Sequence, residues 1–309
     1  MDETKLSEII KVANIHKETD DENTIKLIMN ENRILASHTL PGVNVDAKET
    51  KNGIDVKIIV EEGIIVEKPV HFCFGVLHKD FKQNIDLDVL IKKGAKITVT
   101  GHCIFMGNNK ISHIMHGKVK IEDNADFTYF ERHIHSDSGN IEVYPNAKII
   151  VGKNARYRTE FELIQGLVGT TEFNYEVDAD DDAVIEMEAR MYGKANDKIK
   201  IIENANLHGA RSRAVLKSRV AAKGNAKAEV YNTIRASGDS AKGHVDCREV
   251  LQENGNVQAY PNVEVLHPKA HVTHEASLGG VDNKQLETLM ARGLSEDDAE
   301  DLIIKGMLT

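Results

Sequence analysis

The chain has 309 residues, of which 41% are hydrophobic and 28% charged, so it can bury a substantial core and is not a disordered tail. Its 39 basic and 49 acidic residues give a net charge of −10, which repels nucleic acid and anionic membranes. The absence of Trp and the aromatic content of 5% disfavour sugar-binding clefts and readers of single-stranded nucleic acid. We therefore expect no nucleic acid and no membrane as a partner.

Three well-separated cysteines, Cys73, Cys103 and Cys247, form no C-x-x-C pair. This sparse, odd number predicts free thiols in a reducing compartment and argues against a disulfide framework and a structural zinc site. The first residues are polar and acidic where a signal peptide would be basic and then apolar. No run approaches the roughly 18–20 apolar residues of a membrane span. The sequence therefore predicts a cytoplasmic protein.

Residues 1–27 are predicted to form an N-terminal helical segment. Leu6, Ile9, Ile10 and Val12 recur at helical spacing and predict a short amphipathic helix over residues 4–17. The acidic stretch from 18 to 23 is typical of a loop.

Residues 28–280 are predicted to form an all-β core. Short alternating runs rich in β-branched residues, such as 56–60 and 96–100, are bounded by Gly, Asn or Asp. A polar turn followed by Ala recurs, and the spacings from Ala183 to Ala205 and on to Ala226 are 22 and 21 residues. A repeated corner of this kind predicts a parallel β-solenoid, whereas a β-sandwich, the alternative, would show turns every 8–12 residues without it. The corners end at Ala95, Ala125, Ala147, Ala155, Ala183, Ala205, Ala226 and Ala270.

Residues 281–309 are predicted to form a helical hairpin. Leu286, Leu289 and Met290 form an apolar stripe, and Gly293 ends that first helix. A capping box at Ser295 begins a second helix, for which Gly306 is the expected end. The hairpin either caps the open end of the solenoid or docks a partner.

The sequence carries no motif of a common enzyme class. A P-loop, a nucleophile elbow and His-Glu-x-x-His are all absent, so we expect no catalytic residues and no enzyme. The alternative is a β-helix carbohydrate-active enzyme, which the solenoid alone permits, but the lack of Trp disfavours its substrate groove.

One segment, residues 244–275, concentrates metal-binding side chains. Thiolate, imidazole and carboxylate together suit iron and iron–sulfur species, although a lone Cys near several His is also typical of an ordinary buried thiol. Strand alternation separates His274 from Glu275, so both reach one site only if the strand ends or twists there. The segment contains His244, Asp246, Cys247, Glu249, His267, His271, His274 and Glu275.

The remaining cysteines and a histidine pair have simpler interpretations. Cys73 and Cys103 lie in apolar strand contexts and are expected to be buried core residues. His133 and His135 share a face of a strand, where they are either exposed or line a polar path through the interior.

Three C-terminal motifs resemble the SufB/SufD family of iron–sulfur cluster assembly proteins. They are the P-x-x-E-V strand at 261–265, the H-E-A-S element at 274–277 and the R-G-L-S turn at 292–295, in the order and spacing of that family. The resemblance runs from about residue 90 to the end and is to a minimal, B-like member. It implies a right-handed parallel β-helix core, a dimer packed through the β-helices, and C-terminal helices that dock the SufC-type ABC ATPase.

The resemblance also implies roles for individual residues. Cys247 matches the B-type interface cysteine, and His274 with Glu275 matches the B-type His-Glu element, so these three are the expected ligands of a transient iron–sulfur cluster. Cys103 matches the B-type cysteine that accepts sulfur, and is the expected sulfur relay. His133 and His135 replace the Gln and Trp that line the B-type sulfur path, which puts delivery from a sulfur donor in question.

The predicted function is therefore a scaffold. A homodimer of this chain is expected to build a cluster at its interface and pass it to apo iron–sulfur proteins when its ATPase partner turns over. The alternative within the same family is a structural, D-like subunit that supports another scaffold chain.

Overall fold

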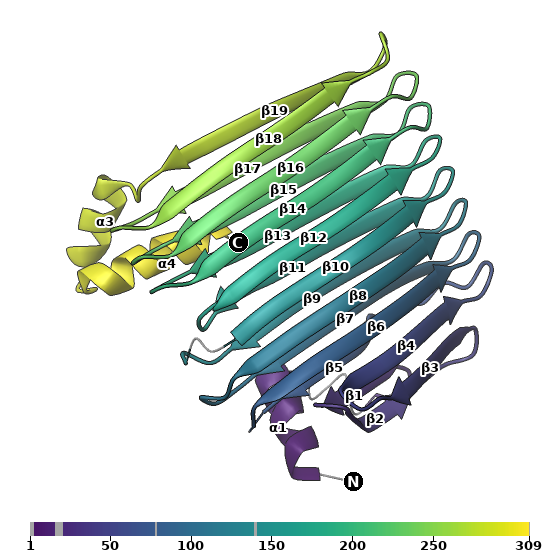
Figure 1. The fold of residues 1–309 in the computed structure, drawn as a ribbon, viewed down its shortest axis with the longest axis horizontal. Coiled ribbons are helices and arrows are strands. Elements are labelled where there is room, and N and C mark those ends of the chain that lie inside the picture. The colour runs from purple at the N-terminus through teal and green to yellow at the C-terminus, as the bar shows by residue number, and fades with distance from the viewer. Residues whose placement is uncertain (1–2, 16–20, 78, 139–140, 309) are drawn as a thin grey trace.

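The computed structural model describes residues 3–15, 21–77, 79–138 and 141–308. The chain winds into a parallel β-solenoid of about 8 turns, with a short N-terminal helix and two C-terminal helices (Figure 1). The predicted solenoid is thus confirmed over the sandwich. Within the described ranges, no helix is long and apolar enough to cross a membrane.

Each full turn contributes one strand to each of two sheets, which hold ten and nine strands over the described residues. Successive turns pair in parallel, while β1–β2 and β3–β4 pair in antiparallel fashion where the solenoid begins. The first sheet contains β1 (Lys26–Asn30), β2 (Arg33–His38), β5 (Val70–Val76), β7 (Lys96–Phe105), β9 (Asp126–His135), β11 (Arg156–Gln165), β13 (Val184–Gly193), β15 (Arg213–Ala222), β17 (Lys242–Leu251) and β19 (His271–Gly279). The second contains β3 (Val43–Glu49), β4 (Gly53–Val60), β6 (Phe81–Ile91), β8 (Ile111–Ile121), β10 (Ile141–Val151), β12 (Thr170–Ala179), β14 (Lys198–Leu207), β16 (Lys227–Ala236) and β18 (Asn256–Val265).

The structural repeat is longer than the alanine spacing suggested. Equivalent residues of neighbouring turns are 28 to 30 positions apart, as in the register of β9 with β11, of β11 with β13 and of β13 with β15. Ala183 and Ala226 follow turns, but Ala205 lies inside β14, so the 22- and 21-residue intervals joined positions that are not equivalent. Ala147 likewise lies inside β10.

One corner of the solenoid keeps the predicted chemistry on six successive turns. A residue with positive φ is followed by a small buried residue, because only a short side chain fits inside the tight bend. Asn and Asp tolerate the left-handed conformation better than most residues. The positive-φ residues are Gly94, Asn124, Asn154, Asp182, Arg211 and Ser240, and the residues that follow them are Ala95, Ala125, Ala155, Ala183, Ser212 and Ala241.

The N-terminal helix covers the outer face of the first turns. Helix α1 (Glu3–Ala13) packs Ile9 against Ile28 and the buried Cys73. It ends earlier than residue 17, at Asn14 with φ of 57°. The rest of the predicted helix, 16 and 17, lies outside the described residues.

The C-terminal helices pack on the flank of the solenoid, not over its end. Helices α3 (Asn283–Met290) and α4 (Glu296–Leu308) cover Tyr192, Ala221 and Val250 on the outside of the first sheet (Figure 1). Tyr192 Oη donates to Asp301 Oδ1 at 2.6 Å. Helix α4 continues through the expected stop at Gly306 because Leu308 is buried against the same cluster. Of the two roles predicted for the hairpin, capping the open end is therefore wrong.

The last turn is consequently left open at its end. Val265 and Leu278 pair in register with the inward-facing Ala236 and Glu249, yet they are 48% and 50% exposed because no further turn covers them. Strand β19 is also the edge of its sheet. An uncovered apolar end with a free strand edge is a surface that soluble proteins usually cover with another chain.

The close stacking of corners predicts that Gly238→Ala lowers the free energy of unfolding by about 2–3 kcal/mol. A Cβ at residue 238 would lie 2.1 Å from the backbone oxygen of Gly209 in the preceding turn, which cannot move without disturbing the coil. The urea midpoint measures the loss. Gly280→Ala is the control, because its Cβ would have its nearest neighbour at 3.6 Å, an ordinary contact. Equal midpoints for the two variants would contradict the close stacking.

Candidate functional site

The structure separates the three predicted cluster ligands onto two faces. The register of β17 and β19 pairs Val245 with His274 and Asp246 with Glu275, so His274 shares the inner face with Cys247 while Glu275 is outside. Strand β19 runs on to Gly279 and neither ends nor reverses at Glu275. Among the described residues, Cys247, His274 and Glu275 do not bring their ligand atoms within 4.8 Å of one another. One chain alone therefore does not assemble this ligand set.

Cys247 lies inside the solenoid among buried polar side chains, which we call the C-terminal cluster: Glu203, Ser218, Asn232, Cys247 and Glu249. The Asn232 amide lies 3.9 Å from Cys247 Sγ, and Ser218 Oγ donates to Glu249 Oε1 at 3.0 Å. Turned so that its nitrogen donates, the same amide reaches Glu203 Oε2 at 3.1 Å. Glu203 Oε1 and Glu249 Oε2 have no hydrogen-bond partner among the described residues. The cluster thus holds a free thiol and spare carboxylate oxygens.

Burial sets the protonation of the C-terminal cluster. It raises the pKa of Cys247 to about 11 and that of Glu249 to about 7. It also raises the pKa of Glu203 to about 8, with a further contribution from the charge of Glu188. A metal species bound here must displace these protons, and the resulting thiolate and carboxylate are donors that suit iron.

The outer face beside this cluster carries a buried ion pair. Arg219 Nη2 lies 2.6 Å from Asp246 Oδ2, and Arg248 Nε lies 3.3 Å from Asp246 Oδ1. Burial alone would raise the pKa of Asp246, but the hydrogen bond and charge of Arg219, with Arg248, hold it below its usual range. Asp246 is therefore an ionised carboxylate on the same face as Glu275, one strand away.

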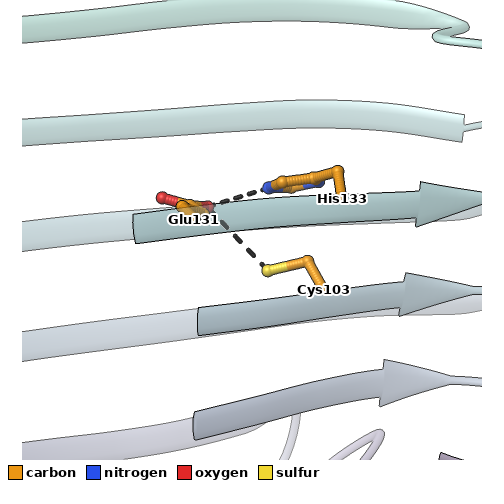
Figure 2. A group of neighbouring side chains, drawn as sticks. All are labelled: Cys103, Glu131 and His133. Atoms are coloured by element: carbon orange, nitrogen blue, oxygen red, sulfur yellow. Dashed lines mark hydrogen bonds and ion pairs between the residues drawn. The ribbon is translucent and has the colours of Figure 1, made fainter. Parts of the chain in front are cut away.

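A second group of buried polar side chains lies nearer the middle of the solenoid, and we call it the central cluster. It consists of Gln83, Cys103, His113, Glu131, His133 and His135, all on inner faces. Cys103 Sγ lies 3.8 Å from both His113 Nε2 and Glu131 Oε1. Figure 2 shows Cys103 and His133 approaching Glu131 from two sides, with 2.8 Å between His133 Nε2 and Glu131 Oε1.

Burial also controls protonation in the central cluster. It lowers the pKa values of His113, His133 and His135 to about 3, so these imidazoles are neutral. It raises the pKa of Glu131 to about 7 and that of the Cys103 thiol well above its usual range. The alternative in which His133 and His135 are exposed is therefore wrong: both lie in the interior.

Strands β11, β12 and β13 lie between the two clusters and carry both apolar and polar inward side chains. The apolar ones include Phe161, Phe173 and Met187, and the buried polar ones include Thr159, Thr171 and Tyr175. The Phe161 ring is tilted against His133 with 4.7 Å between ring centroids and lies edge-on to Phe173 at 5.0 Å. Tyr175 pairs in register with Glu203 of the C-terminal cluster and also donates to Glu131 of the central cluster at 3.3 Å. Buried polar groups thus occur between the two clusters as well as within them.

Sequence reasoning missed the partners that build both clusters. Gln83, His113 and Glu131 were not singled out, nor were Glu203 and Asn232. The available signal was the strand alternation itself, since each of these polar residues occupies a position that alternation assigns to the core. Alternation could not show which residues meet, because the cluster members that contact one another from different strands are 10 to 30 positions apart in the chain.

The chain is thus a parallel β-solenoid that buries thiol, imidazole and carboxylate groups in its interior, leaves its last turn open and carries two helices on its flank. The profile described as SUF system FeS cluster assembly, SufBD core domain, matches residues 78–307. The chain therefore belongs to the SufBD family of iron–sulfur cluster assembly proteins.

Relatives agree with this assignment. An iron-sulfur cluster assembly SufBD family protein of Methanocaldococcus jannaschii is 40% identical over 214 residues, covering 69% of this chain and 68% of the relative. Another, of Pyrococcus horikoshii, is 32% identical over 303 residues, covering 98% and 92%. The iron-sulfur cluster assembly protein SufB of Bacillus subtilis is 30% identical over 71 residues, covering 23% of this chain and 15% of SufB.

Proposed function

We propose that the chain is a cytoplasmic, non-catalytic scaffold on which an iron–sulfur cluster is assembled between two copies of itself and then transferred to apo-proteins. The main observation in support of this proposal is the open end of the last turn. Val265 and Leu278 expose inward-facing apolar surface there, next to the strands that bear Cys247 and His274. A second copy seated on this end would cover that surface.

The division of ligands between two faces also supports a shared site. In one chain Cys247 is covered by its own sheets, and Glu275 lies on the opposite face of the neighbouring strand. A cluster that takes thiolate from one face and carboxylate from the other therefore needs donors from two chains or an opening of the last turn. We assign Cys247 as the principal ligand and His274 and Glu275 as exchangeable ligands, because imidazole and carboxylate hold iron less firmly than thiolate.

The C-terminal helices supply the proposed docking site for an ABC-type ATPase. Helix α4 buries Ile303 and Ile304 against the solenoid but leaves Leu302 and Met307 52% and 48% exposed. Met290 of α3 adds a third exposed apolar side chain. An apolar patch on a short helical hairpin is a typical helix-packing surface for a partner.

The role of Cys103 as a sulfur relay stays a prediction. Its thiol is fully buried, and its raised pKa makes it a weak nucleophile toward a sulfur donor as long as the turns around it stay closed.

Anaerobic reconstitution with iron and sulfide tests the scaffold function. The wild type is expected to gain visible absorption and bound iron and sulfide, and Cys247→Ala is expected to lose most of both because the principal thiolate ligand is gone. Cys73→Ala is the matched control, since Cys73 is an equally buried free thiol beneath α1. Unchanged absorption and iron content in Cys247→Ala would sink the assignment.

A further inference from the structure

The central cluster brings three metal-binding side chains together inside the solenoid and places a fourth, His113, beside one of them. Cys103 comes from β7, and Glu131 and His133 come from β9 (Figure 2). His113 comes from β8. The ligand atoms of Cys103, Glu131 and His133 all lie within 4.8 Å of one another, and His113 Nε2 lies 3.8 Å from the same sulfur. All four side chains are buried.

The spacing of these atoms fits one small metal ion. Tetrahedral coordination at usual bond lengths places a sulfur ligand about 3.6 Å from a nitrogen ligand and an oxygen ligand about 3.4 Å from a nitrogen ligand. The structure has 3.8 Å between Cys103 Sγ and His113 Nε2 and 2.8 Å between His133 Nε2 and Glu131 Oε1. A side-chain shift that brings His113 Nε2 closer to the ligand atoms of Glu131 and His133 would complete a four-ligand coordination shell.

Hydrogen bonds from behind fix the orientation of His113. Gln83 Nε2 donates to the backbone oxygens of Glu31 and Gly75 at 2.7 and 3.3 Å, so its Oε1 must face His113. His113 Nδ1 lies 2.8 Å from that oxygen and must donate to it. The lone pair of His113 Nε2 is therefore free and directed at Cys103 Sγ.

A second chain of hydrogen bonds orients His133. His135 Nδ1 donates to the carbonyl of Leu167 at 2.9 Å, which leaves His135 Nε2 as an acceptor. His133 Nδ1 lies 3.4 Å from that acceptor and donates to it. The lone pair of His133 Nε2 thus points at Glu131. Both imidazoles thus present bare nitrogens, one to Cys103 Sγ and one to Glu131 Oε1, an arrangement typical of supported metal ligands.

The charges of the four side chains also favour a bound divalent cation. Within the part of the chain that the structure describes, no Lys or Arg forms an ion pair with Glu131, whose partner is the neutral His133. A thiolate and a carboxylate carry two negative charges, so a divalent cation makes the group of four neutral in a dry interior, where an uncompensated charge is costly. Tyr175 Oη donates to the other Glu131 oxygen at 3.3 Å and leaves Oε1 for the cation.

We propose that Cys103, His113, Glu131 and His133 form a binding site for a single divalent first-row transition-metal ion of the Fe(II) or Zn(II) type. Binding releases the Cys103 and Glu131 protons and forms one bond each to sulfur and oxygen and two to nitrogen, with no change of oxidation state. The site is distinct from the open end, because its ligands come from β7, β8 and β9, whereas β18 and β19 form the open end. It is loaded as the chain folds, since its ligands are covered once the turns close.

Refolding the full chain anaerobically with Co(II) alone tests the proposal. The wild type is expected to bind one equivalent and show a thiolate-to-cobalt charge-transfer band with intense visible bands of a tetrahedral ion. Cys103→Ser is expected to lose the charge-transfer band, and Glu131→Gln to weaken binding by at least tenfold. Cys73→Ser and Cys247→Ala are expected to keep the wild-type spectrum.

Circular dichroism shows whether each variant has folded, so a lost band is not confused with a misfolded chain. The Cys247→Ala variant separates metal binding at Cys103 from the proposed scaffold function, which depends on Cys247. A folded wild type without the charge-transfer band, or a band that survives Cys103→Ser and disappears in Cys247→Ala, would overturn the site. If Cys103 instead carries sulfur, a thiol-labelling reagent would modify Cys103 equally fast in the Co(II)-refolded chain and in the metal-free chain. Protection of Cys103 by Co(II) supports the metal site.

Discussion

Between about pH 5 and pH 8.5 the free energy of unfolding of the wild type is expected to fall with rising pH, and Glu203→Gln is expected to make this fall smaller by about 3 kcal/mol. Burial raises the pKa of Glu203 to about 8, against an ordinary value of 4.5. Between these values the folded chain keeps the proton while the unfolded chain releases it. The unfolded state then binds fewer protons, so the free energy of unfolding falls as pH rises from about 4.5 to about 8 and levels off above that.

Urea denaturation at several pH values measures this effect. Glutamine keeps the shape of the side chain and cannot ionise, so the variant lacks the part of the decline that Glu203 causes and is more stable than the wild type at high pH. The remaining slope belongs to other buried carboxyls such as Glu131 and Glu249, whose pKa values are raised to about 7. Glu186→Gln removes a negative charge at an exposed position and is the control. Parallel stability curves for the wild type and Glu203→Gln would contradict the buried neutral carboxyl.

Leu278→Asp is expected to convert a dimer of this chain into a monomer, raising its dissociation constant by roughly 100-fold or more. Leu278 faces inward on the uncovered last turn and is 50% exposed in one chain, so the carboxylate stays hydrated in the monomer. In a dimer that covers the open end, the same charge would be buried among apolar side chains without a partner. Sedimentation equilibrium of the wild type and of Leu278→Asp measures the two dissociation constants.

Ile150→Asp is the matched control for that substitution. Ile150 is another apolar residue, 55% exposed, but it lies on β10, far along the solenoid from β19. It is expected to leave the oligomeric state unchanged. A Leu278→Asp protein that dimerises as strongly as Ile150→Asp would place the interface elsewhere and remove the main support for a cluster shared at the open end.

The two outcomes bear on different parts of the molecule. Glu203 reports on the interior beside Cys247, whereas Leu278 reports on the surface that a second copy would cover. A loss of cluster assembly in Leu278→Asp with an intact interior would tie the function to dimerisation.

The sequence by itself determined the class of fold and the local chemistry of its corners. Alternating β-branched runs give each strand one face to bury, and a polar turn followed by Ala fits a tight coil, so the solenoid followed from local patterns. The two C-terminal helices also followed from local signals, and Ser295 forms the expected cap with Asp298. The repeat length did not follow, because Ala205 in the middle of a strand resembles Ala183 at a corner.

Only the tertiary structure decided which functional side chains meet. The register of β17 with β19 pairs Glu275 with Asp246 on the outer face and leaves Cys247 inside, and a shift of one residue would exchange those faces. The central cluster brings Gln83 to His113 and Cys103 to Glu131, each pair from neighbouring turns. Their sequence separation follows the length of a turn, which depends on how strands stack and not on any local motif. The physical reason is that alternation fixes the face of a side chain, while stacking of turns fixes its neighbours.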